Sequence, residues 1–193
     1  MNNLQLQNIQ EFVYRESVNI TDPQHDLSHA QRVKSNAVKI ARILELDKHL
    51  NLNLLVGMSL LHDMHYSTYS PGIKTYLFEG RIAKKFIKEI ISQFDLTAEE
   101  QDLIIEAIVS HSHSYPFRKL NKKKDHYTKI LQDADTLDFF SDLRLKALTH
   151  SRNKFFFYKL IWKIGQKLYY RNKKQLNKYL NYPQLVNHLN LFS

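Results

Sequence analysis

Apolar residues recur along most of the chain every three or four positions, which is the spacing of one face of an α-helix. No segment shows the sustained alternation of apolar and polar positions that a strand requires. Only four Gly and four Pro interrupt the 193 residues. The pattern predicts an all-α fold, with helices at about 3–17, 28–46, 51–64, 76–94, 98–112, 126–147, 153–180 and 183–190.

Three short signals mark where these helices begin or end. Asp22 and Pro23 stand ahead of the second helix and predict its start. Thr97 and Glu100 form a capping box, in which each side chain accepts a backbone N–H that would otherwise be free. The Pro71-Gly72 pair breaks the chain after the third helix.

A chain of 193 residues forms one domain and buries about 70% of its unfolded surface, so its stability requires neither a disulfide nor a metal. Any metal that it binds is therefore expected to be functional. The chain has no Cys, which excludes thiolate zinc sites, iron–sulfur clusters and cysteine nucleophiles. Its first residues do not read as a secretory signal, and no apolar run reaches the roughly 18 residues of a membrane span. We therefore expect a soluble, cytoplasmic protein with no membrane span.

The net charge of +9 is concentrated at one end of the chain. Residues 1–142 contain all 19 acidic side chains and 17 basic ones, whereas the last 51 residues contain 11 Lys and Arg and no acid. Basicity is thus a property of the C-terminal segment. We predict a helical body over residues 1–150 and a basic, aromatic helical extension over residues 151–193.

Four segments place histidines or acids beside the apolar helical pattern. They are HDLSHAQRV (25–33), SLLHDMHYS (59–67), IVSHSHSYP (108–116) and LQDADTLDFF (131–140). Taken singly, a lone His is usually a surface residue or a satisfied core residue, and Asp133 and Asp138 fit solvated or capping groups. The adjacent His62 and Asp63 are harder to explain, because burying two such groups is costly unless a partner compensates them.

Taken together, the four segments carry one ordered set, which is His29, His62-Asp63, His111 and Asp135. This order resembles the H…HD…D pattern of the HD-domain superfamily of metal-dependent phosphohydrolases. The resemblance extends over about residues 22–142, and the chain is most similar to small stand-alone bacterial HD proteins. Some of those proteins cleave nucleoside triphosphates to monophosphates and pyrophosphate.

By this resemblance His29, His62, Asp63 and Asp135 are the expected metal ligands. Imidazoles and carboxylates together suit one divalent ion, whose identity among Mn²⁺, Fe²⁺, Ni²⁺, Co²⁺, Zn²⁺ and Mg²⁺ stays open. Adjacent residues on a helix point about 100° apart. His62 and Asp63 can therefore share an ion only near a deformed helix end, which the loop after them supplies. Such an ion lowers the pKa of its water and polarises a phosphoryl oxygen.

Four further residues are candidates for roles beside the ion. The candidate catalytic residues are Asp63, His111 and His65. His111 is expected to contact a phosphate oxygen or the attacking water. His65 either donates a proton to the leaving group or faces water. Arg32 lies one helical turn after His29 and either clamps a phosphate or forms a salt bridge. Lys74 is a weaker candidate for phosphate binding.

A complete second metal site is not expected. HD proteins with two metals usually carry another His on the helix after the HD motif, just ahead of a Gly. Here that region reads TYLFEGRIA (75–83), and no His lies between positions 66 and 110. The diiron oxygenase chemistry of some HD proteins is therefore not expected either.

The basic extension interleaves Lys and Arg with Phe, Trp and Tyr, and its role stays open. Phe156, Leu160, Ile164 and Leu168 follow helical spacing, which favours packing of this row on the body while the lysines stay in water. Alternatively, the segment binds nucleic acid or another polyanion, or lies on a membrane or protein surface.

The function that these features predict is hydrolysis of a phosphate ester or anhydride, with a nucleotide as the expected substrate. The alternative is a non-enzymatic module that senses a nucleotide and contacts nucleic acid through its basic extension. The oligomeric state, including a homodimer, is open.

Overall fold

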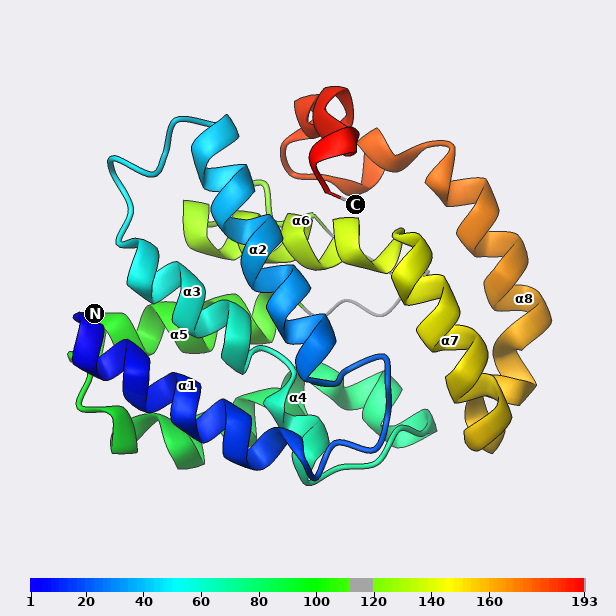
Figure 1. Ribbon diagram of the computed structural model, residues 1–193, viewed down its shortest axis with the longest axis horizontal. Coiled ribbons are helices and arrows are strands. Elements are labelled where there is room, and N and C mark those ends of the chain that lie inside the picture. The colour runs from blue at the N-terminus through cyan, green and yellow to red at the C-terminus, as the bar shows by residue number, and fades with distance from the viewer. Residues whose placement is uncertain (112–119, 193) are drawn as a thin grey trace.

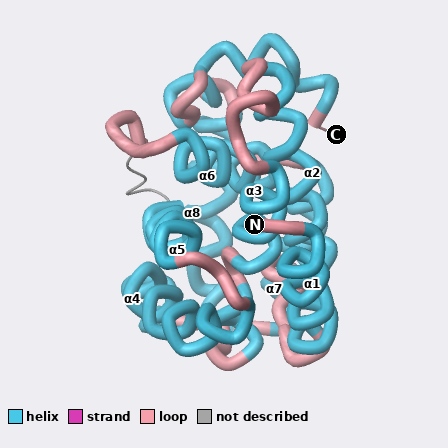
Figure 2. Tube along the Cα trace, turned by 90° about the vertical axis from the view of Figure 1, so that its left-hand side faces the viewer, coloured by secondary structure: helices cyan, strands magenta, loops and turns pink. Residues whose placement is uncertain are grey.

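The computed structural model describes residues 1–111 and 120–192 of the chain, and this part contains helices and no strand (Figures 1 and 2). The predicted all-α fold is therefore confirmed. The α-helices are α1 Asn3–Ser17, α2 Leu27–Ile43, α3 Leu52–Leu61, α4 Ile73–Ile90, α5 Ala98–His111, α6 His126–Phe139, α7 Asp142–Lys154 and α8 Phe156–Lys173. Short 3-10 helices follow at η1 Met64–Ser67, η2 Ile91–Phe94, η3 Leu176–Tyr179 and η4 Pro183–Leu191.

The core lies between α2, α3, α5 and α6, and α3 is its most apolar element. Leu54, Leu55, Met58, Leu60 and Leu61 of α3 are all buried, because other helices surround it. Removing each such side chain from water contributes about 1.5–3 kcal/mol. This helix ends directly before His62, so the chain delivers the His-Asp pair from the middle of its core.

Several predicted helix boundaries differ from the structure. The predicted helix 126–147 is two helices, because α6 ends at Phe139 and the Ser141 hydroxyl caps α7 by accepting the Arg144 N–H at 3.1 Å. The capping box of Thr97 and Glu100 is confirmed by two reciprocal hydrogen bonds of 3.1 and 3.2 Å. The second helix begins at Leu27, one residue before its predicted start at 28, and Asp26, rather than Asp22 or Pro23, caps it. The predicted end of the fifth helix at residue 112 lies outside the described residues.

Helices α7 and α8 form a pair on one side of the body (Figure 1). Buried Asp22, in the loop before α2, joins them to the body by accepting hydrogen bonds from the Ser151 hydroxyl at 2.6 Å and the Tyr158 hydroxyl at 2.7 Å. The predicted helix 153–180 is shorter, because α8 ends at Lys173. Within the described residues, no helix combines the length and apolar character needed to cross a bilayer.

The expected packing of the apolar row of α8 on the body is wrong. Phe156, Leu160 and Ile164 are exposed, whereas Tyr158 and Tyr169 on the opposite side of α8 are buried. The Tyr169 hydroxyl donates to the backbone oxygen of Phe140 at 3.0 Å. The two tyrosines thus satisfy their hydroxyls inside the molecule, which turns the apolar row outward.

Candidate metal centre

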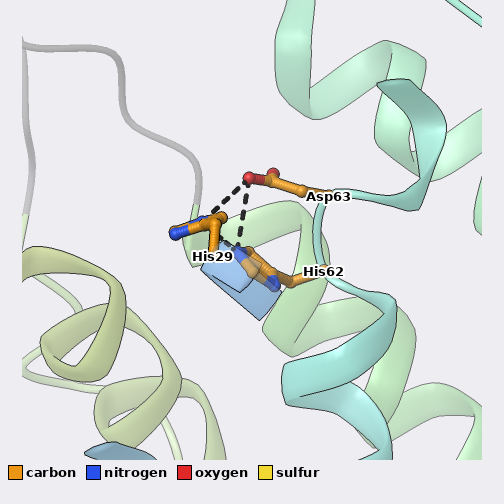
Figure 3. Close-up of side chains that lie close together, drawn as sticks. All are labelled: His29, His62 and Asp63. Atoms are coloured by element: carbon orange, nitrogen blue, oxygen red, sulfur yellow. Dashed lines mark hydrogen bonds and ion pairs between the residues drawn. The ribbon is translucent and has the colours of Figure 1, made fainter. Parts of the chain in front are cut away.

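His29, His62 and Asp63 meet where α2 passes the end of α3 (Figure 3). All three side chains are buried. The Asp63 Oδ2 atom lies 3.3 Å from the Nε2 atoms of both His29 and His62. Asp63 has left the helical conformation, with φ −110° and ψ 10°. The deformed helix end expected from the sequence is therefore present, and it lets two adjacent residues face one space.

The backbone fixes which nitrogen the imidazoles present to this space. The Nδ1 atom of His62 lies 2.7 Å from the Ser59 carbonyl oxygen, and that of His111 lies 2.6 Å from the Ile108 carbonyl oxygen. A carbonyl only accepts, so each Nδ1 carries the hydrogen and each neutral ring has its lone pair on Nε2. The Nε2 atom of His111 lies 3.5 Å from Asp63 Oδ1.

The Nδ1 atom of His29 is held by a carboxylate. It lies 2.7 Å from Asp138 Oδ2, and the His29 Nε2 atom lies 3.0 Å from that of His62. When both rings are neutral with Nδ1 protonated, their two Nε2 lone pairs face each other, and either a proton on one Nε2 or a cation between them relieves that repulsion. Asp63 Oδ1 is buried with no hydrogen-bond partner in the described chain. These donor atoms fit a divalent metal, and the Asp138–His29 contact is the kind of outer partner that orients a metal-binding imidazole.

Asp135 completes the set of residues predicted as ligands. Its Oδ1 atom lies 3.6 Å from His29 Nε2. The structure thus brings His29, His62, Asp63 and Asp135 together, with His111 beside them. Their role as metal ligands stays a prediction.

The ionisation of these residues favours positive charge at the centre. Burial opposes the charged form of His62, but the Asp63 carboxylate outweighs it and raises the pKa of His62 to about 9. Burial likewise opposes ionisation of Asp63, yet His62 and His25 hold the pKa of Asp63 well below its usual range. Burial lowers the pKa of His29, and the charge of Arg144 acts in the same direction. Asp63 therefore stays ionised and attracts a proton or a cation.

Arg32 forms a salt bridge, which is one of the two roles that the sequence predicted for it. Its Nε and Nη2 atoms donate to Asp138 at 2.5 and 3.2 Å. The interpretation of Asp138 as a solvated or capping group is wrong, because Asp138 is buried between His29 and Arg32. Asp133 is also buried and accepts from the backbone N–H groups of Asn181 and Tyr182, at 2.8 and 2.9 Å.

His65 does not face water, contrary to the favoured expectation. It is buried, and neither ring nitrogen has a hydrogen-bond partner in the described part of the chain. Burial lowers the pKa of His65 to about 3, which disfavours the protonated form that a proton donor needs. Asp63, His65 and Glu79 form a second group that could hold a metal, with one ligand atom of each lying within 4.8 Å of the others.

Sequence reasoning missed two residues of this region, Glu79 and His25. Glu79, which accepts from the Tyr66 hydroxyl at 3.0 Å, directly precedes Gly80, where a second histidine was sought. His25 lies with its Nε2 atom 4.0 Å from Asp63 Oδ2. Its sequence signal was the first His-Asp pair of the chain. Lys74, the weaker candidate for phosphate binding, is exposed in the first turn of α4.

Comparison with known proteins gives one match. A family model described as the HD domain matches residues 26–139, which is more than half of the chain. No curated protein and no solved structure matches the sequence.

Proposed function

The chain belongs to the HD-domain family, and we propose that it is a divalent-metal-dependent phosphohydrolase that cleaves a phosphate ester or anhydride of a nucleotide. Convergence of the donor atoms of His29, His62 and Asp63 in a buried space is the observation that carries this proposal. A cluster built only for stability would not leave Asp63 Oδ1 buried without a hydrogen-bond partner in the described chain, because unsatisfied buried groups cost free energy.

The side chains divide the work of such a reaction. His29, His62, Asp63 and Asp135 hold one divalent ion. When bound, this ion supplies positive charge to a phosphoryl oxygen and to the attacking water. His111, whose Nδ1 hydrogen is engaged by the Ile108 carbonyl, presents Nε2 to accept a proton from that water or to contact the phosphate. Asp138 and Arg32 act behind His29 and keep its ring oriented.

The substrate class rests on the resemblance to HD proteins that cleave nucleoside triphosphates. The reaction forms a bond between the water oxygen and phosphorus, and it breaks the bond from phosphorus to the leaving oxygen. A panel of nucleoside mono-, di- and triphosphates tests it with chelator-stripped protein reloaded with Mn²⁺, Fe²⁺, Ni²⁺, Co²⁺, Zn²⁺ or Mg²⁺. We expect release of phosphate or pyrophosphate with at least one metal. No product from any combination contradicts the enzymatic proposal.

The number of ions is tested separately from turnover. We expect elemental analysis to find one tightly held ion per chain, lost on removal of His62 and kept in His65→Ala. Two tight ions in the parent protein and one in His65→Ala would contradict a single ion. That result would place the second ion in the group of Asp63, His65 and Glu79.

A further inference from the structure

Arg144 is a buried cation beside the centre, and it lies outside the family match. It stands in the first turn of α7, after residue 139 where the match ends, and only 5% of it is exposed. Its Nη1 atom lies 3.8 Å from Asp138 Oδ2. Burial opposes its charged form, but the carboxylates of Asp138, Asp135 and Asp63 outweigh burial and raise the pKa of Arg144. The guanidinium therefore stays charged next to the site.

Two of the three guanidinium nitrogens of Arg144 have no hydrogen-bond partner in the described chain. Its Nε and Nη1 atoms are buried with no hydrogen-bond partner there, whereas Arg32 gives two donors to Asp138. A role as counter-charge for the surrounding acids explains the charge of Arg144 and leaves these donors unexplained. These two donors lie on different edges of the planar guanidinium, so each can donate to a phosphate oxygen that the described chain does not supply.

We propose that Arg144 binds a phosphate group of the substrate. This inference rests on the proposed function, since it supplies the phosphate clamp that Arg32, held by Asp138, does not provide. In this proposal α7 supplies the phosphate-binding residue, whereas the predicted metal ligands all lie in the matched region 26–139.

Binding of inorganic pyrophosphate to the metal-loaded protein, measured by calorimetry, tests the proposal without turnover. We expect Arg144→Gln to weaken binding by about 10-fold or more, and Arg144→Lys to fall between it and the parent, because Lys keeps the charge but lacks the fixed planar donors of Arg. Lys146→Gln, which removes a charge from an exposed position of the same helix, is the matched control. Metal content should be unchanged in all three variants, and circular dichroism should show that each variant keeps the helical fold at the temperature of the binding measurement.

The outcomes separate this inference from the proposed function. If the parent protein binds pyrophosphate and Arg144→Gln binds it equally well, the assignment of Arg144 is wrong and the hydrolase proposal stands. If Arg144→Gln loses its metal, Arg144 orients the centre instead, and the assignment is wrong again. If the parent protein neither binds pyrophosphate nor hydrolyses any nucleotide, both proposals fail.

A second feature, independent of the site, is the outward face of α8, which we define as Phe156, Lys159, Leu160, Lys163, Ile164, Lys167, Tyr170 and Arg171. All eight residues are exposed. They span about 140° of the helix circumference, opposite the buried side. The face contains four large apolar or aromatic side chains, four cations and no acid.

We infer that this outward face lies on the surface of an anionic lipid bilayer. Basic side chains beside apolar ones suit that surface, where the apolar groups enter the headgroup region and the cations meet lipid phosphates. Two copies of the chain would bring eight cations together, which opposes pairing through this face. Nucleic acid would meet the cations and leave the aliphatic Leu160 and Ile164 in water.

Sedimentation with vesicles of phosphatidylcholine containing about 30% phosphatidylglycerol tests this inference. We expect the protein to bind them, to bind pure phosphatidylcholine weakly, and to dissociate as salt is raised. Replacing Phe156, Leu160 and Ile164 by Ser should weaken binding by about 10²-fold. The matched control replaces three apolar residues outside this face, Val18, Leu4 and Leu77, by Ser. Their exposed fractions of 79%, 66% and 62% match those of Phe156 (79%), Ile164 (67%) and Leu160 (62%).

Binding that the triple replacement leaves unchanged would overturn the assignment. So would a protein that ignores anionic vesicles. A third result would also overturn it: the parent protein does not bind vesicles, but it binds nucleic acid or forms a dimer, and the triple replacement abolishes that binding or that dimer. Nucleic acid or a second copy of the chain would then occupy the face.

Discussion

The candidate metal centre buries ionisable side chains, whereas the outward face of α8 exposes large apolar ones. His29, His62 and Asp63 lie inside the protein, and Phe156, Leu160 and Ile164 lie on its surface. Each region reverses the usual distribution of polar and apolar groups.

Asp22 shows how the chain balances a buried charge by itself. This carboxylate is also buried, and it accepts hydrogen bonds from Ser151, Tyr158 and the backbone of Gln24. Asp63 is different, since its Oδ1 atom has no hydrogen-bond partner in the described chain and its Oδ2 atom faces two imidazole nitrogens. A structural carboxylate such as Asp22 therefore has hydrogen-bond partners within the protein, whereas a carboxylate that awaits a ligand keeps an oxygen without one.

The largest expected effect comes from removing the buried carboxylate of the centre. Asp63→Ala should abolish metal retention and lower turnover by about 10³-fold or more, because the ion supplies several kcal/mol of charge stabilisation. The helical fold should survive, since a domain of this size does not need the ion for its core. Elemental analysis, turnover and circular dichroism measure these effects. If the variant is unfolded, Asp63 is a structural carboxylate like Asp22, and the contrast between the two residues is wrong.

The sequence allowed prediction of the parts of this site that depend on local order. His29, His62, Asp63 and Asp135 stand in a recognisable sequence of motifs, and the structure brings them together.

Other features depend on partners far along the chain. Asp22 meets Ser151 and Tyr158, which lie 129 and 136 residues away, so its sequence context suggested only a helix start. Arg144 was hidden because the helical pattern continues past residue 139, where Ser141 starts a new helix. The inward side of α8 could not be chosen from spacing, since hydrogen bonds of Tyr158 and Tyr169 decide it.

Replacing His111 tests whether turnover can be lowered while the metal ion stays bound. His111→Ala should lower turnover by about 10²-fold, the low end for one positioned acid–base or electrostatic group. One tightly held ion per chain should remain, because four other predicted ligands are present. Metal analysis and steady-state turnover of the same preparation test this. Loss of the ion in His111→Ala would make His111 a ligand.

Asp138 tests whether the orientation of His29 matters. Asp138→Asn should weaken metal binding by about 10- to 100-fold, because loss of an outer partner frees the imidazole ring. Asp142→Asn, at an exposed carboxylate paired with Lys173, is the control. Competition with a metal-binding dye measures both affinities. Equal affinities in the two variants would show that His29 needs no such support.

The smallest expected effect concerns the balanced carboxylate, Asp22, and its dependence on pH. Burial alone would raise the pKa of Asp22, but His25 and the hydrogen bonds from Ser151 and Tyr158 outweigh it and hold that pKa below its usual range. A depressed pKa means that the ionised form stabilises the folded state above about pH 4, and that this contribution is lost as pH falls further. Asp22→Asn should therefore lower the free energy of unfolding by about 1–2 kcal/mol at pH 7.

The difference between Asp22→Asn and the parent protein should shrink as the pH is lowered from 5 towards 2, because the Asp22 carboxyl of the unfolded parent protein takes up a proton in this range while that of the folded protein stays ionised. Urea unfolding of both proteins at several pH values measures it, with Asp102→Asn, at an exposed position of α5, as the control. A difference that stays constant down to pH 2 would mean that shape, not charge, holds α7 and α8 on the body. Asp22 would then no longer be the balanced counterpart of Asp63.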